Sequence, residues 1–135
     1  MLALDLAHAL RDAGLTWQPQ NGDRFAIPDR EMDDQVFVVS NMVIERLQLP
    51  AGEVLAFNGT TEWALDSLEA GEALWLPRED QLRDELGEAF LALERLAGEP
   101  AGYAVTVSIG GDTRRYVDID AESAYARALL DLLRR

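Results

Sequence analysis

Three carboxylates stand close together near the end of the chain: Asp118, Asp120 and Glu122. Paired carboxylates can bind a cation or carry out general acid–base chemistry. Asp120, however, also has the residue type and the position of a helix N-cap, whose side-chain oxygen accepts hydrogen bonds from the first free N–H groups of a helix. Glu122 would then lie in the first helical turn, where negative charge is favourable. We therefore expect a structural role for these residues, and no catalytic or metal-binding residue is predicted.

A set of aromatic side chains is the second group that could carry a function, because aromatic residues often line small-molecule pockets. On strands such residues more often belong to the core. A small-ligand-binding protein, or a carboxylate-based enzyme with an aromatic-lined pocket, is therefore the alternative functional prediction. Its pocket residues would be Trp17, Trp63, Trp75 and Tyr103, with Phe57 beside them.

The residue types that are missing exclude most familiar active sites. All 12 basic residues are arginine and there is no cysteine. Without lysine, a phosphate-gripping P-loop lysine and Schiff-base chemistry are excluded, and without cysteine so is thiolate chemistry. His8, the only histidine, would have to support any catalytic triad alone. We therefore predict that the protein is not an enzyme and uses no cofactor.

Negative charge is concentrated in the middle of the chain. The formal net charge is −13, and residues 62–88 hold nine acids and two arginines. Such a chain repels nucleic acid and anionic lipid surfaces, so neither is expected as a partner. The alternatives are an acidity that only maintains solubility and an acidic surface for a basic protein partner. The predicted partner-binding residues share one exposed helix: Glu79, Asp80, Asp84, Glu85 and Glu88.

The last third of the chain predicts a strand, a tight turn, a second strand and a capped helix. Apolar residues alternate along residues 103–109, and Gly110-Gly111-Asp112 suits a hairpin turn. On the returning strand Arg115, Val117 and Ile119 are expected to share the buried face. A helix after Asp120 would cover the hairpin with a stripe formed by Ala121, Tyr125, Ala128 and Leu132. In this helix Asp131 stands four residues before Arg135, a spacing that favours an ion pair.

Earlier in the chain the patterns alternate between helix and strand. Helices are predicted at residues 2–13 and from residue 79 to residue 86, the latter anchored by Leu82 and Leu86. The acidic stretch of residues 29–34 is interpreted as a solvated connection rather than a calcium loop. Strands are expected at residues 25–27, 35–40, 42–49, 54–57, 73–76 and 90–96, with those at 35–40, 42–49 and 54–57 forming a meander. Residues 62–66 fit either a strand or one helical turn, and a strand is favoured because Trp63 and Leu65 alternate with polar residues.

These elements predict a single α+β domain over residues 1–135, with antiparallel sheets, an N-terminal helix, a short middle helix and a C-terminal helix packed on the sheet. The first residues are apolar but carry Asp5, Arg11 and Asp12 and lack a basic start, so they do not predict a signal peptide. No apolar run approaches the roughly 18 residues that span a membrane. A cytoplasmic location is therefore expected, while the oligomeric state is left open.

Several segments resemble a group of small actinobacterial proteins commonly labelled pilus assembly protein CpaE. The similar segments are residues 22–25, 32–38, 57–66, 75–82 and 116–130. CpaE proteins proper are larger and look like P-loop ATPases that localise pilus machinery. This chain has no Gly-Lys-Ser/Thr motif, so no ATPase activity and no catalytic residue is carried over. The resemblance implies an association with pilus or secretion machinery.

Overall fold

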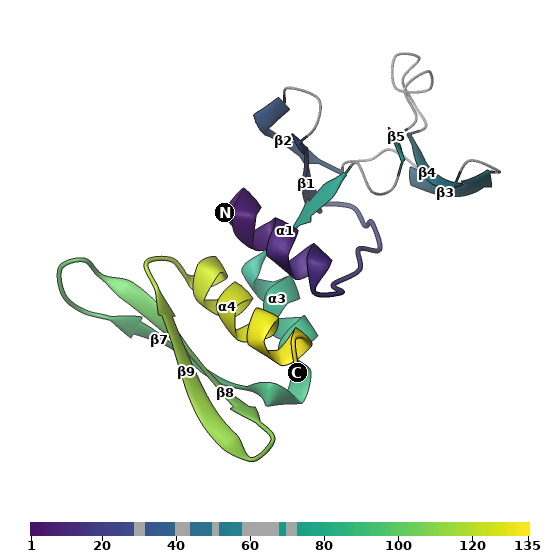
Figure 1. Cartoon of the computed structure of the whole chain (residues 1–135). Helices are drawn as coiled ribbons and strands as arrows, with labels where there is room; N and C mark the ends of the chain where they lie inside the picture. The colour runs from purple at the N-terminus through teal and green to yellow at the C-terminus, as the bar shows by residue number, and fades with distance from the viewer. Residues whose placement is uncertain (29–31, 40–43, 50–51, 58–67, 70–72) are drawn as a thin grey trace. The chain divides into compact units, whose positions relative to one another are not determined.

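The computed structural model describes residues 1–28, 32–39, 44–49, 52–57, 68–69 and 73–135. The chain divides into two compact units. Unit 1 joins Met1–Thr16 to Leu76–Arg135, and unit 2 is Trp17–Trp75. Helices and antiparallel strands both occur (Figure 1), so the predicted α+β class is confirmed.

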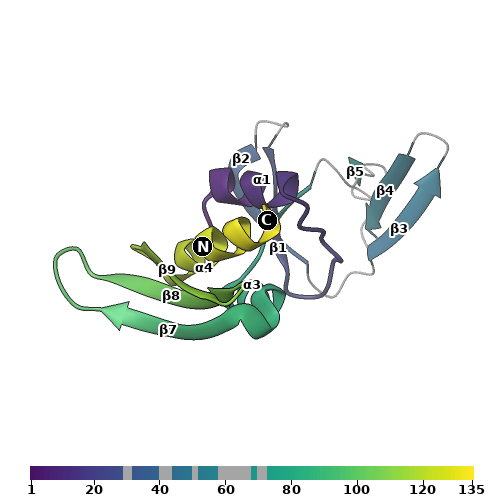
Figure 2. The same cartoon turned by 60° about the horizontal axis from the view of Figure 1, so that its bottom comes forward.

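Unit 1 is a three-stranded antiparallel sheet with helices on one of its faces. The strands β7 (Phe90–Leu96), β8 (Gly102–Ile109) and β9 (Asp112–Asp118) are ordered β7-β8-β9. Helix α4 (Ala121–Leu133) lies across β8 and β9, as Figures 1 and 2 show. The other two helices, α1 (Leu4–Asp12) and α3 (Glu79–Leu86), pack against α4 rather than on the sheet.

Helix α4 is the centre of the unit 1 core, which explains why its sequence is rich in alanine. Neighbours on several sides bury most of the helix, and small side chains let them approach closely. Tyr125 is fully buried and its ring lies 5.7 Å from that of Phe90. Besides Tyr125, the buried α4 residues are Ala121, Ser123, Ala124, Ala126, Ala128, Leu129 and Leu130. Residues from both ends of the sequence meet here, because Ala7 and Leu10 of α1 are buried as well.

The predicted hairpin turn is confirmed. Gly110 and Gly111 have φ angles of 58° and 87°, which side chains other than glycine rarely adopt. The two-residue turn pairs Ile109 directly with Asp112, and this pairing sets the register of β8 against β9.

That register corrects the prediction for the returning strand. Directly paired residues point to the same face of a sheet, and Val105 pairs with Tyr116. Tyr116 therefore shares the α4-facing side with the buried Val105, whereas Val117 is 50% exposed and Ile119 is 69% exposed. Arg115, Val117 and Ile119 do not form the buried side of this strand. The prediction followed hydrophobicity, but the length of the turn decides which residues face the helix.

Unit 2 contains two small antiparallel sheets. The first has the order β2-β1-β6 and the second the order β3-β4-β5. Their strands are β1 (Arg24–Ile27), β2 (Met32–Val38), β3 (Ile44–Leu49), β4 (Gly52–Phe57), β5 (Leu68–Glu69) and β6 (Leu74–Leu76).

Two predictions for unit 2 are wrong. The meander fails because β2 pairs with β1, which precedes it in the chain, whereas β3 pairs with β4. The solvated connection predicted at residues 29–34 is shorter than expected. Pairing of Ile27 with Met32 begins β2 at Met32, so Asp33 and Asp34 are strand residues. Pairing with the preceding strand β1 overrides the local preference of aspartate for loops. The segment predicted at residues 62–66 lies outside the described residues.

A buried carboxylate fixes the entry to β1. Asp23 is 1% exposed and accepts hydrogen bonds from the Trp17 indole N–H at 2.9 Å and from the Gln20 backbone N–H at 3.0 Å. The Trp17 ring then lies 5.4 Å from Phe25, which stacks 5.5 Å from Phe37. Because buried polar groups are costly unless they are paired, Asp23 holds this turn in one conformation.

Candidate functional site

Helix α3 forms where the sequence predicted a short amphipathic helix. The Arg78 backbone N–H donates to Oε1 of Gln81 at 2.9 Å, which satisfies one free N–H group at the start of the helix. Leu82 is 0% exposed and Leu86 is 3% exposed, so both predicted anchors are confirmed. The helix ends at Leu86, and Gly87 follows with a φ of 56°.

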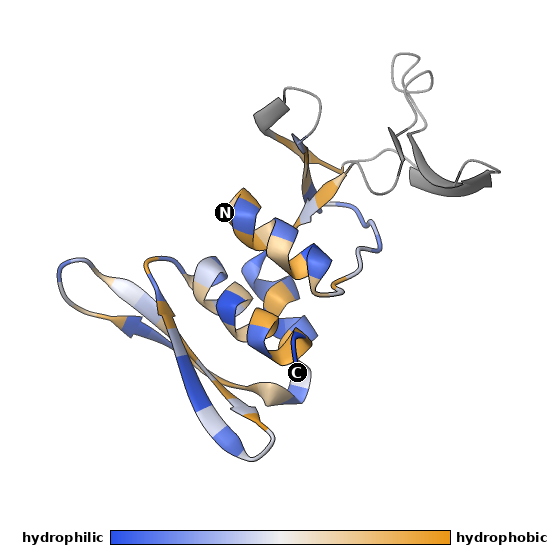
Figure 3. Cartoon of the chain, in the orientation of Figure 1, coloured by the Kyte–Doolittle hydropathy of each residue, from blue (hydrophilic) through white to orange (hydrophobic). Residues whose placement is uncertain are grey.

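The opposite side of α3 is negatively charged, as expected. Four of the predicted partner-binding residues are exposed and Glu79 is half-buried. We call the five the α3 acidic surface: Glu79, Asp80, Asp84, Glu85 and Glu88. The surface continues past the helix because Glu88 belongs to the short 3-10 turn Gly87–Ala89. The α3 ribbon is predominantly hydrophilic in colour in Figure 3.

Ion pairing distinguishes the α3 acidic surface from two acids of the sheet strands β7 and β9. Asp118 binds Nε of Arg127 at 2.5 Å, and Glu94 lies 3.6 Å from Nε of Arg115. Within the α3 acidic surface, Asp80 is paired with Arg78 at 3.2 Å. In the described part of the chain, no ion pair involves Asp84, Glu85 or Glu88. The fold therefore leaves most of this charge to be neutralised by solvent ions or by a partner.

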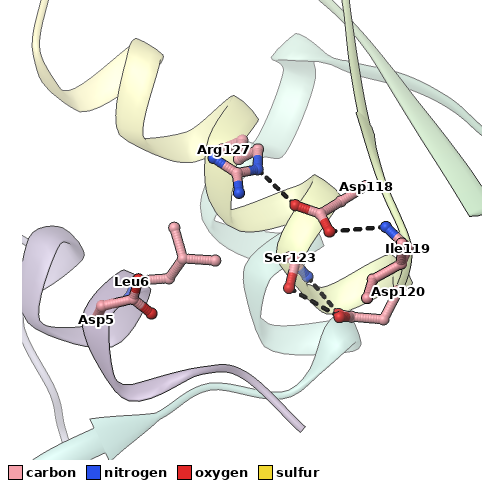
Figure 4. Close-up of polar contacts among 7 residues, drawn as sticks. All are labelled: Asp5, Leu6, Asp118, Ile119, Asp120, Ser123 and Arg127. Atoms are coloured by element: carbon pink, nitrogen blue, oxygen red, sulfur yellow. Dashed lines mark hydrogen bonds and ion pairs between the residues drawn. The ribbon is translucent and has the colours of Figure 1, made fainter.

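The carboxylates around residue 120 have structural roles, which Figure 4 shows. Asp120 caps α4: its two oxygens accept from the Ser123 N–H at 2.7 Å and from the Ser123 hydroxyl at 2.9 Å. This confirms the predicted N-cap. Asp118 accepts from the Ile119 N–H at 2.7 Å in addition to its contact with Arg127. Each carboxylate has its own partner, so this geometry does not assemble an acid–base pair.

A cluster around Asp131 joins β9 to α4, and sequence reasoning identified only part of it. The Tyr116 hydroxyl donates to Oδ2 of Asp131, and Arg114 and Arg135 lie 3.4 Å and 3.3 Å from the same oxygen. The Asp131–Arg135 spacing of four residues was visible in the sequence. Tyr116 and Arg114 were missed because the opposite side of their strand was expected to face the helix. The correct register through the Gly110-Gly111 turn would have indicated both residues.

The same contacts shift two pKa values in opposite directions. Burial raises the pKa of Tyr116 above its ordinary value of 10.0, and the hydrogen bond to Asp131 raises this pKa further. The pKa of Asp131 falls below its ordinary value of 3.8, first because Tyr116 donates to the carboxylate and then because Arg135 does. The folded state thus favours a protonated Tyr116 beside an ionised Asp131.

We expect Tyr116→Phe to lower the melting temperature by an amount that depends on pH. A lowered carboxyl pKa contributes stability above pH 3.8 that is lost as the pH falls, and a raised hydroxyl pKa contributes stability below pH 10.0 that is lost as the pH rises. The difference in melting temperature between Tyr116→Phe and the wild type should therefore be greatest between pH 3.8 and pH 10.0 and smaller outside this range. Melting curves across this range test the prediction. A melting-temperature difference for Tyr116→Phe that stays constant across this pH range would contradict the assignment.

The predicted pocket residues lie in different units. Trp17 and Trp75 belong to unit 2 and Tyr103 to unit 1, while Trp63 lies outside the described residues. Trp17 has a core role, because it packs on Phe25 and donates to Asp23. Trp75 is half-buried on β6, and Tyr103 is half-buried on the α4-facing side of β8. The aromatic pocket therefore stays a prediction.

The chain matches no protein-family model, no curated protein and no solved structure. Within the described ranges, no helix combines the length and apolar character that crossing a bilayer requires. Over the same ranges, no group of three or more His, Asp or Glu side chains is placed to hold a metal ion. His8 lies on α1, where its Nδ1 is 3.2 Å from Arg11, with no carboxylate among its hydrogen-bond partners in the described residues.

Proposed function

We propose that the protein is a non-catalytic, cytoplasmic protein-interaction module that binds a basic partner through the α3 acidic surface. The observation that carries the proposal is the uneven ion pairing of unit 1. Acids at the junction of β9 and α4 are matched with arginines, whereas Asp84, Glu85 and Glu88 are exposed and take part in none of the ion pairs among the described residues.

Electrostatics supports a partner rather than an intramolecular role for these acids. Asp80 and Asp84 are like charges four residues apart on α3, a spacing that weakens a helix by about 0.2–0.5 kcal/mol. Basic side chains on a partner would remove that repulsion. Such contacts at the rim of an interface mainly increase the association rate and the specificity. The resemblance to proteins labelled CpaE suggests pilus or secretion machinery as the place to look for the partner.

The test is a charge reversal on α3 with a matched control. We expect Asp84→Arg/Glu85→Arg to lose a basic host partner that the tagged wild-type protein retains at low salt, because two charges on the docking surface change sign. The melting temperature should stay level or rise, since helical repulsion falls. Affinity purification followed by mass spectrometry measures retention, and thermal melting measures stability.

The control variant is Asp12→Arg/Glu99→Arg, which makes the same net charge change at two exposed acids away from α3. It should retain the partner. Raising the salt concentration should release the partner from both the wild type and the control, because exposed charges are screened. Equal retention by the α3 variant and the control would contradict the proposal.

A further inference from the structure

The side of the β7-β8-β9 sheet that faces away from α4 carries several exposed side chains, and we call this side the outer face. The strand register shows which residues lie on this face: Ala104 pairs with both Glu94 and Val117, and Thr106 pairs with Arg115. Residues paired in this way share a face, and α4 packs on the opposite one through Tyr116 and Asp131. The outer face includes the half-buried Ala92 and Thr106, the fully buried Ala104, and the exposed Glu94, Arg115 and Val117. Ile119 follows directly after β9.

Apolar groups are exposed at one end of this face. Val117 is 50% exposed and Ile119 is 69% exposed, although both are large aliphatic side chains. Figure 3 shows hydrophobic colour on the end of β9 that leads into α4. Exposed aliphatic residues that adjoin one another on a sheet are typical of interaction surfaces. The edges of the sheet are less suited to pairing, because β7 carries a bulge near Phe90 and charges at Glu94 and Arg95.

The charge of the outer face indicates which partner it fits. The chain carries a net charge of −13, yet the outer face has one acid and one base, Glu94 and Arg115, which lie 3.6 Å apart. A strongly basic or acidic partner gains little from such a surface. A surface that presents one charge of each sign is complementary to itself, because a two-fold axis can place Arg115 of one copy opposite Glu94 of another.

We propose that the outer face binds the outer face of a second copy of this chain about a two-fold axis, so that the two sheets stack as in a β-sandwich. Such sheets pack about 10 Å apart, which brings aliphatic side chains of both copies into contact. A face of three short strands is smaller than the roughly 800 Å² per partner of a standard stable interface. The dimer is therefore weak and depends on protein concentration.

Analytical ultracentrifugation of the full chain over a range of concentrations tests this interface. The wild type should show a monomer–dimer equilibrium, and Val117→Glu/Ile119→Glu should weaken it about tenfold or more by burying charge. The matched control is Val36→Glu/Val38→Glu, at two valines of β2 in unit 2 that are 37% and 57% exposed. This variant should dimerise as the wild type does. A wild type that stays monomeric at every concentration, or a double variant that dimerises equally well, would overturn the proposal.

A charge exchange shows whether the contact lies between two chains. Glu94→Arg gives a face with two positive charges and Arg115→Glu a face with two negative charges, so each variant alone should dimerise less than the wild type. An equimolar mixture should restore dimers, which an ion pair within one chain cannot explain. No recovery in the mixture would overturn the two-fold arrangement.

Salt separates this inference from the proposed function. Two copies that each carry −13 repel at long range, so added salt should strengthen the dimer. The same salt should weaken the binding of a basic partner to the α3 acidic surface. If dimerisation weakens as salt is added, the proposed dimer through the neutral outer face is contradicted. The proposal for the α3 acidic surface is not affected by that result.

Discussion

A chain that ends at Asp120 is expected to lose the cooperative unfolding of unit 1, because it lacks the helix around which that unit is built. Eight residues of α4 are buried, and Tyr125, Ala124, Ala126 and Ala128 are completely so. Removing a large buried side chain typically costs about 2–5 kcal/mol, and a whole domain is stable by about 5–15 kcal/mol. The unfolding free energy lost with the helix is therefore larger than the total unfolding free energy expected for unit 1.

Thermal melting followed by circular dichroism measures this effect, and two further variants support it. A chain that ends at Leu133 removes only the exposed Arg134 and Arg135 and should still unfold cooperatively. Tyr125→Ala should lower the unfolding free energy by about 3–5 kcal/mol, since the ring is fully buried against Phe90. Cooperative unfolding of unit 1 in the chain that ends at Asp120 would show that α4 is an accessory helix.

The second large effect is expected for Asp23→Ala in unit 2. The substitution leaves the Trp17 indole N–H and the Gln20 N–H without their acceptor in a buried site. Hydrogen bonds to charged groups contribute about 1.5–3 kcal/mol each, and an unpaired buried donor is costly. We expect a loss of about 2–4 kcal/mol in unfolding free energy.

Urea unfolding followed by tryptophan fluorescence is a suitable measurement, since Trp17 is itself one of the donors. Asp12→Ala, which removes an exposed acid of α1, should change the unfolding free energy by less than about 0.5 kcal/mol. If Asp23→Ala were no more destabilised than Asp12→Ala, the buried carboxylate would not be holding the turn before β1.

Local patterns in the sequence predicted the parts of unit 1 that depend on neighbouring residues. The glycine turn, the Asp120 cap, and α3 with its two leucine anchors each rest on interactions within a few residues, and each is confirmed. The acids of α3 were also placed correctly on its exposed side, since helical periodicity fixes the angle between them and the anchors.

The pairing of one element with another was harder to predict than the elements themselves. The face of β9 depends on counting residues through the turn from Ile109 to Asp112, and apolar Val117 and Ile119 suggested the wrong side. Strand β2 pairs with β1, and no residue of β2 indicates whether its partner is the preceding or the following strand. The Tyr116–Asp131 contact depends on both the register of β9 and the placement of α4, so it could not be found before them.

The order of the two units along the chain has a consequence for folding during synthesis. Unit 1 is made of Met1–Thr16 and Leu76–Arg135, and α1 packs on α4. In the sequence, all of unit 2 lies between these two helices. Unit 2 is continuous, so it can close while the ribosome is still adding the residues of β7 to α4. Throughout that time Ala7 and Leu10 of α1 remain without the helix that buries them. A segment that is synthesised before unit 2 and buried only after unit 2 is complete is a natural binding site for a chaperone on the growing chain.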